Sequence, residues 1–337
     1  MYAINGALGS PYSMKMRALM RYRRIPHMWV HGPDTRDALG KVKAPVIPVM
    51  EYPDGTFHND STPLIYDLEA RHAERSVIPP DPAHAFIAHL IEDFADEWVT
   101  KAMFGYRWLE EVDQIQMSRW LAFDAMKGGG LASSQAFAEQ FRARQVGRMA
   151  IVGCAAENFP LIEASTRAIL GALETHVVGN HCLFGTRPSI AEFGMYGQLS
   201  QLGVDPTAQA MMRADYPYSF RWLLHIDDMS GINGQWDTEI AGGDAPFAPI
   251  ISAWLEQVGA IYMPFLLANA AAIEAGDETF SITAMGLPYT QGVFKYQVKC
   301  LADLRARYAA LDNAARAKVD PLLAQTGCLN ALLDPCA

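Results

Sequence analysis

The sequence lacks a disulfide or redox-motif pattern. Its five cysteines are odd in number and widely spread, and no C-x-x-C pair occurs among them: Cys154, Cys182, Cys300, Cys328 and Cys336. This usage is typical of reduced thiols in a cytosolic protein rather than of a secreted, disulfide-bonded one. We expect Cys154 and Cys182, which stand in apolar helical surroundings, to be packed rather than reactive.

The motifs of several common enzyme classes are also missing. His84 and His89 are five positions apart and do not fit the H-E-x-x-H spacing of a zinc site. The run Lys127-Gly128-Gly129-Gly130 is not followed by the G-K-[ST] of a phosphate loop. No G-x-S-x-G occurs, which excludes a nucleophile elbow. We therefore expect no metal.

Positive charge is in deficit, with 27 Lys and Arg against 37 Asp and Glu and a net charge of −10. This balance argues against nucleic acid or an anionic membrane as the main partner. The start of the chain shows no basic segment followed by an apolar one, and the apolar run 260–273 contains Pro264 and Asn269. We expect a cytoplasmic protein that does not enter a membrane.

What is present predicts two fold classes in succession. The 337 residues are enough for two domains, and half of them are hydrophobic. The first 80 residues predict an α/β domain in the order βαβ-α-ββα, with Pro53-Asp54-Gly55 as the turn of its hairpin. Its expected strands are 1–4, 28–31, 46–52 and 56–58, and its expected helices are 11–24, 35–39 and one from Asp60 or Ser61 to 71. Pro79-Pro80-Asp81-Pro82 is the expected linker.

Everything after this linker predicts helices. Apolar residues recur at helical spacing over 85–98, 137–152, 161–178, 193–202, 218–229, 246–275, 294–311 and 314–326. Residues 280–289 fit either a hairpin or an irregular loop. We interpret 83–242 as an all-helical domain and 243–337 as a helical extension packed on it.

A hydroxyl stands where the first expected strand turns into the first helix. Ser10-Pro11-Tyr12-Ser13 opens this helix, with proline where a missing N–H costs nothing. A helix N-terminus presents free N–H groups and partial positive charge, so it stabilises an anion such as a thiolate. The alternative is that Ser10 and Ser13 only cap the helix.

Four patterns in this order resemble the glutathione transferase superfamily. Ser10-Pro11-Tyr12-Ser13 is similar to its active-site turn, and Ile47-Pro48-Val49 to its cis-proline step. Asp60-Ser61 resembles the acidic-Ser pair that opens its third helix. Residues 184–193, Phe-Gly-Thr-Arg-Pro-Ser-Ile-Ala-Glu-Phe, resemble its F-x-G-x-x-P-S-x-A-D-F signature, with Glu192 for the usual Asp. The resemblance covers residues 1–236, and the tail departs from it.

The resemblance implies a thioredoxin-like domain that binds glutathione as co-substrate, followed by an all-helical domain, in a homodimer. Ser10 is the expected hydrogen-bond donor to the glutathione thiolate, with Ser13 and Tyr12 as rivals. Of Pro45 and Pro48, we choose Pro48 as the cis residue, with Val49 offering its N–H and C=O to the cysteinyl backbone. Asp60 and Ser61 suit the amine and carboxylate of the γ-glutamyl end.

Fewer sequence observations support the other parts of the expected site. For the glycyl carboxylate we expect Arg36 or Lys41 as partner. For an apolar electrophile we expect a pocket between the domains that includes Phe104, Tyr106 and Trp108, part of an aromatic stretch that also contains Trp98 and Trp120. The alternative for each aromatic residue is core or dimer packing.

The expected activity is transfer of the glutathione thiolate to an apolar electrophile. A glutathione-dependent lyase, dehalogenase or isomerase on the same site is an alternative. A transferase-like binding or scaffold protein without catalysis is another, favoured by the long tail.

Overall fold

A computed structural model describes residues 1–333 of the chain, so Cys336 lies outside the described residues. The chain divides into two compact units that interleave in sequence. The first comprises Met1–Val77, Tyr106–Gly147 and Glu192–Asn233, and the second comprises Ile78–Gly105, Arg148–Ala191 and the chain from Gly234 onward. The division into domains at 80 and 243 stays a prediction.

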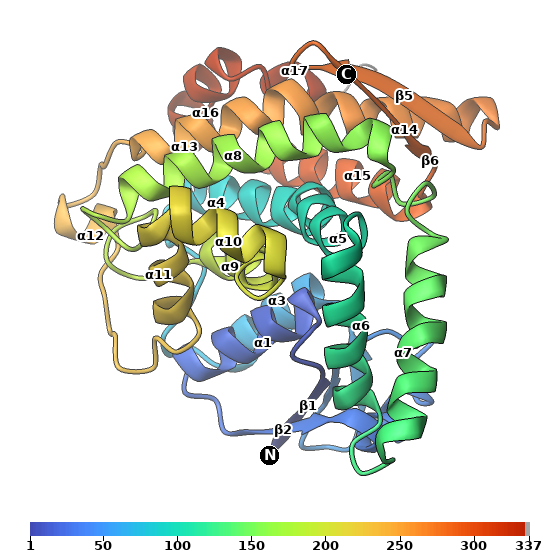
Figure 1. The fold of residues 1–337 in the computed structure, drawn as a ribbon. Coiled ribbons are helices and arrows are strands. Elements are labelled where there is room, and N and C mark those ends of the chain that lie inside the picture. Colours follow the sequence, from blue (N-terminus) through green and yellow to red (C-terminus); the bar gives the residue numbers. More distant parts are fainter. Residues whose placement is uncertain (334–337) are drawn as a thin grey trace. The chain divides into compact units, whose positions relative to one another are not determined.

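The first unit begins with a mixed four-stranded sheet in the order β2-β1-β3-β4. Its strands are β1 (Tyr2–Gly6), β2 (His27–His31), β3 (Val49–Glu51) and β4 (Phe57–Asn59). β1 pairs parallel with β2 and antiparallel with β3, which pairs antiparallel with β4. Helices α1 (Pro11–Tyr22) and α3 (Ser61–Arg71) lie side by side (Figure 1). The predicted thioredoxin-like α/β fold is confirmed.

Burial explains why these segments fold as they do. Every residue of β1 is buried, and Met16, Leu19 and Met20 of α1 are fully buried at helical spacing. β3 begins only at Val49, whereas the predicted strand began at 46. The preceding Pro48 has no N–H to give to a ladder, and Val46 is 59% exposed.

Helices complete the first unit. They are η1, a 3₁₀ turn (Gly32–Thr35), α2 (Arg36–Leu39), α6 (Glu111–Ala125), α7 (Leu131–Val146), α9 (Ile190–Leu202), α10 (Pro206–Asp215) and α11 (Pro217–Ile226). α6 and α7 lie side by side (Figure 1). The connection between them contains Gly128 and Gly130 at positive φ. The sequence did not predict α10.

The second unit is largely helical. Its elements are α4 (Pro82–Phe94), η2, a π-helical turn (Ala95–Val99), α5 (Thr100–Trp108, whose residues from Tyr106 onward belong to the first unit), η3 (Ala156–Asn158), α8 (Phe159–His176), α12 (Asp237–Ile240), α13 (Pro249–Gln257), η4, a second π-helical turn (Val258–Tyr262), α14 (Met263–Ala275), β5 (Thr279–Ala284), β6 (Leu287–Gly292), α15 (Lys295–Ala309), α16 (Asn313–Gln325) and α17 (Leu329–Leu332). The predicted helical region after the α/β domain is confirmed.

Residues 279–292 form a hairpin, the first of the two alternatives left open by the sequence. Its two-residue turn, Met285-Gly286, has positive φ at both positions, which matches the twist of the flanking strands. Tyr289 of β6 packs its ring 5.2 Å from that of Trp98 and 6.1 Å from that of Phe265. The hairpin is thus part of the aromatic core of the second unit.

Residues Pro249–Ala275 form 27 consecutive helical residues, long and apolar enough to cross a membrane by length and composition. This helical stretch is longer than the apolar run 260–273 that the sequence shows. Trp254, Tyr262 and Phe265 along it are buried in the second unit, and Trp254 Nε1 donates to the Ile169 carbonyl at 3.1 Å. We interpret this stretch as a core helix.

The four cysteines within the described residues are free and buried. Burial raises the pKa of the Cys154 thiol to about 12, so that it stays protonated at neutral pH. The prediction that Cys154 and Cys182 are packed is confirmed.

Candidate functional site

The turn between β1 and α1 places the Ser10 hydroxyl at a helix N-terminus. Ser10 is the N-cap of α1, and its Oγ accepts the Ser13 N–H at 3.3 Å. Because this oxygen already accepts from the helix, the hydroxyl hydrogen remains available for an acceptor outside it. Ser10 is half-buried, as is Tyr12 in the first turn of the helix.

Ser13 lies in a different environment. Its side chain is fully buried, and its Oγ has no hydrogen-bond partner among residues 1–333. It packs against Gly6 at the end of β1, where an added Cβ would lie 2.8 Å from Ser13 Oγ and 2.9 Å from the Trp29 ring. The chain approaches so closely here that Gly6 has no room for a side chain, and Ser13 is enclosed beneath the turn.

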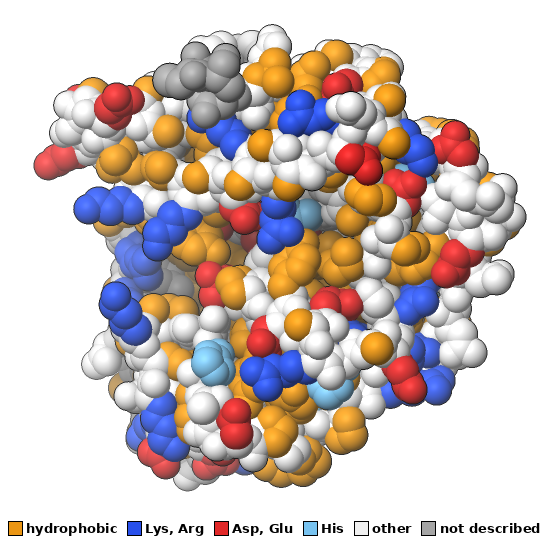
Figure 2. Space-filling model, turned by 180° about the vertical axis from the view of Figure 1, so that it is seen from behind, with side chains coloured by type: hydrophobic (Ala, Val, Ile, Leu, Met, Phe, Trp, Pro, Cys, Tyr) orange, Lys and Arg blue, Asp and Glu red, His pale blue; other side chains and the backbone are white. Residues whose placement is uncertain are grey.

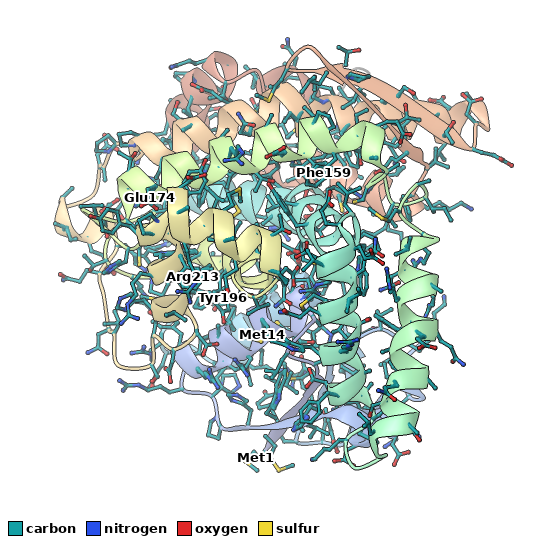
Figure 3. All side chains as sticks on the ribbon, in the orientation of Figure 1. Met1, Met14, Phe159, Glu174, Tyr196 and Arg213 are labelled. Carbon is teal, nitrogen blue, oxygen red and sulfur yellow. The ribbon has the colours of Figure 1, made fainter. Side chains whose placement is uncertain are left out.

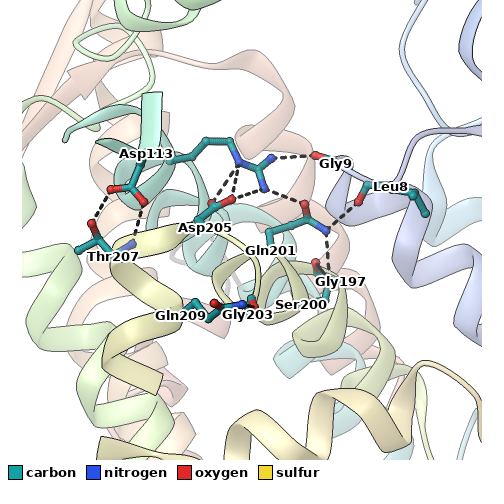
Figure 4. A network of polar contacts seen from close by, with 11 residues as sticks. Leu8, Gly9, Asp113, Gly197, Ser200, Gln201, Gly203, Asp205, Thr207 and Gln209 are labelled. Carbon is teal, nitrogen blue, oxygen red and sulfur yellow. Dashed lines mark hydrogen bonds and ion pairs between the residues drawn. The ribbon is translucent and has the colours of Figure 1, made fainter. Parts of the chain in front are cut away.

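A buried ion pair between Arg107, in the part of α5 that belongs to the first unit, and Asp205, the N-cap of α10, holds the main chain of this turn together with Gln201 of α9 (Figure 4). Arg107 and Asp205 are 3% and 0% exposed, and their closest atoms are 3.0 Å apart. The Arg107 guanidinium also donates to the Gly9 carbonyl and to Gln201 Oε1, both at 2.8 Å. Gln201 Nε2 donates to the Leu8 carbonyl at 3.2 Å. Two carbonyls just before Ser10 are therefore fixed by a preorganised network.

The same network extends to the start of α10. Asp113 of α6 accepts the Thr207 N–H at 2.8 Å and its hydroxyl at 2.5 Å. This satisfies a free N–H in the first turn of α10 with a buried carboxylate. No sequence pattern pointed to Arg107, Gln201 or Asp205, because they lie far from the turn along the chain.

The bond Ile47–Pro48 is cis, as chosen from the sequence. Val49, the residue expected to meet a peptide ligand, lies within the sheet and pairs with Asn5 of β1 and Asn59 of β4. Its carbonyl also accepts from Asn5 Nδ2 at 3.2 Å. Within residues 1–333, the N–H and C=O of Ile47 make no hydrogen bond. Ile47 therefore has the free main-chain groups that were expected at Val49.

Asp60 and Ser61 stand at the start of α3. Asp60 has a φ of 77°, a conformation that L residues rarely adopt and that is common at functional sites. Ser61 is buried, and its Oγ accepts from Lys15 Nζ at 3.2 Å. Lys15 is itself fully buried on α1. An ammonium can only donate, so Ser61 Oγ is the acceptor in this contact.

The two expected partners for a glycyl carboxylate lie between β2 and β3. Arg36, the first residue of α2, is exposed. Lys41 is also exposed, and its Nζ lies 4.0 Å from the centre of the Phe57 ring of β4. Both cations are thus accessible to an anion.

A cavity of about 670 Å³ adjoins the turn. Its wall includes Leu8 and Gly9 of the turn, Met14 of α1 (Figure 3), and Trp120 and Phe123 of α6. Trp120 and Phe123 are 51% and 75% exposed. Large exposed aromatic side chains beside a cavity are typical of a binding site for an apolar molecule.

The expected pocket residues lie elsewhere. Tyr106 and Trp108 are buried and do not line this cavity, and Phe104 belongs to the second unit. Trp120, the last residue of the aromatic stretch, does line it. Of the aromatic stretch, Trp120 alone is among the residues that line this cavity within residues 1–333.

Charge on the surface is mixed. Figure 2 shows Asp and Glu side chains interspersed with Lys and Arg on one face, so the acidic excess forms no continuous patch there. No group of three or more His, Cys, Asp or Glu side chains in the described part of the chain is placed to hold a metal ion.

Comparison with known proteins finds a family that is similar to the N-terminal region. The family described as glutathione S-transferase, N-terminal domain, matches residues 5–76. No curated protein matches the chain. A glutathione S-transferase from Methylobacterium radiotolerans, solved in complex with glutathione sulfonate, is 19% identical with a TM-score of 0.41, over 68% of this chain and 91% of its own.

Two further solved structures are similar to the chain. A glutathione S-transferase from Rhodospirillum rubrum is 16% identical with a TM-score of 0.45, over 74% of this chain and 96% of its own. A glutathione S-transferase from Methylobacillus flagellatus, with glutathione bound, is 17% identical with a TM-score of 0.39, over 66% of this chain and 93% of its own. By the family match, residues 5–76 of the chain resemble the glutathione transferase superfamily.

Proposed function

We propose that the chain is a glutathione-dependent transferase in which Ser10 donates a hydrogen bond to the glutathione thiolate. The observation that carries this proposal is the Ser10 hydroxyl, capped onto α1 through its oxygen and adjoining an apolar cavity through Gly9. The enclosure of Ser13 beneath the turn favours Ser10 over Ser13 as the donor.

The expected stabilisation of the thiolate is large enough to ionise the glutathione thiol at pH 7. A free thiol with a pKa of about 8.5 is only a few per cent ionised at pH 7. Lowering the pKa by about two units makes the thiolate dominant and requires about 2.7 kcal/mol. A hydroxyl hydrogen bond to an anion, about 1.5–3 kcal/mol, together with the helix N-terminus, supplies this amount.

The thiolate then attacks an electrophilic carbon held in the cavity. A carbon–sulfur bond forms from the sulfur lone pair, and either the leaving group departs with its bonding electrons or a double bond accepts them. The Ser10 hydroxyl donates throughout and forms no covalent bond. Its role is electrostatic stabilisation rather than nucleophilic catalysis.

The remaining parts of glutathione have partners of suitable chemistry. The free N–H and C=O of Ile47 suit the cysteinyl backbone, in place of Val49. Ser61, with Lys15 behind it, suits the γ-glutamyl carboxylate, and Asp60 suits the amine. Arg36 or Lys41 suits the glycyl carboxylate. A homodimer in the cytoplasm is part of the same proposal, from the resemblance alone.

The test is the Ser10→Ala variant. Calorimetry measures glutathione affinity, and thiolate absorbance against pH measures the pKa of the bound thiol. We expect this pKa to rise by about one to two units and turnover at pH 7 to fall about 3- to 25-fold, in proportion to the thiolate fraction, with affinity changed much less. Ser13→Ala is the matched control and should leave the thiol pKa unchanged. An unchanged rate in Ser10→Ala removes Ser10 from the mechanism, and absence of glutathione binding at millimolar concentration refutes the function.

A further inference from the structure

The cavity beside the turn contains one ionisable side chain, Asp124 near the end of α6. Two other polar residues line it, and both are already bonded. The Ser200 hydroxyl donates to the Gly197 carbonyl at 2.9 Å, and Gln201 is held by Arg107 and the Leu8 carbonyl. The other lining side chains are apolar.

The Asp124 carboxylate differs from every other polar group of this wall. No hydrogen bond or ion pair to it is formed within residues 1–333. It is half-buried, and burial raises the pKa of Asp124, with the charge of His31 acting in the opposite direction. An acceptor that faces an apolar cavity without a partner favours a ligand that brings a donor.

We propose that Asp124 is the specificity-determining residue of the cavity, and that the preferred electrophiles are aromatic molecules carrying a hydroxyl or amine donor. The proposal rests on the proposed function, because it takes the cavity as the electrophile site. Its chemistry is one hydrogen bond from the donor of the substrate to the Asp124 carboxylate, formed while the aromatic body contacts Trp120 and Phe123.

The preference for ligands that carry a donor follows from the loss of water around Asp124. An aromatic ligand that fills the cavity displaces the water that solvates Asp124. A ligand without a donor leaves the carboxylate desolvated and unpaired, whereas a ligand with a donor replaces the lost hydrogen bond. Sites built in this way reject the analogue that lacks the polar group. We expect a preference of about 10- to 100-fold for the donor-bearing member of a matched pair.

Product-like conjugates test the proposal without requiring turnover. The probes are S-benzylglutathione, S-(3-hydroxybenzyl)glutathione and S-(4-hydroxybenzyl)glutathione, titrated by calorimetry together with glutathione. In the wild-type protein, at least one hydroxybenzyl conjugate should bind about 10- to 100-fold more tightly than the benzyl conjugate. Asp124→Leu should abolish this ratio, and Asp124→Asn, which keeps an acceptor oxygen, should retain part of it.

Glu139→Leu on α7 is the matched control, because Glu139 is an exposed carboxylate outside the cavity. It should keep the wild-type ratio. Should Asp124→Leu fail to fold, a loss of at least threefold in the ratio for Asp124→Asn supports the proposal, and an unchanged ratio overturns it.

Different results would contradict the role of Asp124 and the proposed function. If glutathione binds and all three conjugates bind equally to the wild type, the role of Asp124 is wrong and the proposed function stands. If the preference persists in Asp124→Leu, another group recognises the donor and the role of Asp124 is again wrong. If neither glutathione nor any conjugate binds, both proposals are wrong.

Discussion

Replacing Arg107 with methionine removes the cation at the centre of the network that holds the candidate active-site turn (Figure 4). Asp205 is fully buried, so the substitution leaves a desolvated carboxylate without its partner. Breaking a buried pair in this way costs about 3–5 kcal/mol. The Gly9 carbonyl and Gln201 Oε1 lose their donors as well. We expect the free energy of unfolding to fall by about 4 kcal/mol.

A double-mutant cycle separates the free energy of the ion pair from that of the packing around it. Asp205→Leu alone leaves Arg107 without its carboxylate and should cost a similar amount. The double variant Arg107→Met/Asp205→Leu buries no charge and should cost only about 2 kcal/mol, far less than the sum of the two single changes. Urea unfolding, followed by both tryptophan fluorescence and far-UV circular dichroism, measures each free energy. The two probes must coincide, because the chain has two compact units.

A surface pair provides the control. Arg142 and Glu111 are 3.2 Å apart with side chains 33% and 77% exposed, so Arg142→Met should cost less than about 1 kcal/mol. If the single changes at Arg107 and Asp205 add to give the double variant within about 0.5 kcal/mol, the two residues are not coupled and the reasoning fails.

Three further predictions concern other contacts. Lys15→Met should weaken glutathione binding about 10-fold by calorimetry, because the ammonium orients the hydroxyl at the start of α3; equal weakening toward an analogue without the γ-glutamyl carboxylate contradicts this role. Gly197→Ala places a Cβ 2.8 Å from a main-chain oxygen of α1 and should cost about 1–3 kcal/mol in urea unfolding. Gly171→Ala, with open space around it, is the control and should be neutral or stabilising. Hydrogen bonding to His89 helps to lower the pKa of Asp303 to about 2 from 3.8. The folded-state pKa lies below the unfolded one, so this stabilisation is present above pH 4 and is lost as the pH falls toward 2. Because Asp303 is half-exposed, about 1 kcal/mol is expected, and acid unfolding of Asp303→Asn should lack that loss.

Local patterns were sufficient to predict the α/β fold. The turn at Pro53-Asp54-Gly55, the capped helix after Ser10 and the alternation of strands and helices each depend on neighbours in sequence. The limits of α7 were less well predicted, at 137–152 against the observed Leu131–Val146, because the apolar residues of this helix form no buried stripe and Ala138 is its only buried residue. Without periodicity, a helix boundary has no signal to fix it.

The local geometry of the candidate site was predictable where neighbours in sequence determine it, and not where contacts between distant residues determine it. Ser10, Pro48 and Ser61 are recognisable from their positions at turns and helix starts. Whether Ser10 or Ser13 faces outward depends on the close approach of Gly6, a contact between β1 and α1 that no spacing reveals. Likewise, Val49 was chosen from sequence, but its carbonyl is bonded to Asn5 across the sheet.

The turn before Ser10 is constrained on one side and open on the other. The carbonyls of Leu8 and Gly9 accept from Gln201 and Arg107, while the same two residues line the cavity. Moving the turn to fit a substrate would break hydrogen bonds to a buried ion pair, which is costly in a site shielded from water. The substrate must therefore fit the turn rather than reshape it. Under the proposed function, Ser10 would then be positioned before the ligand arrives, which is the condition for electrostatic stabilisation without reorganisation.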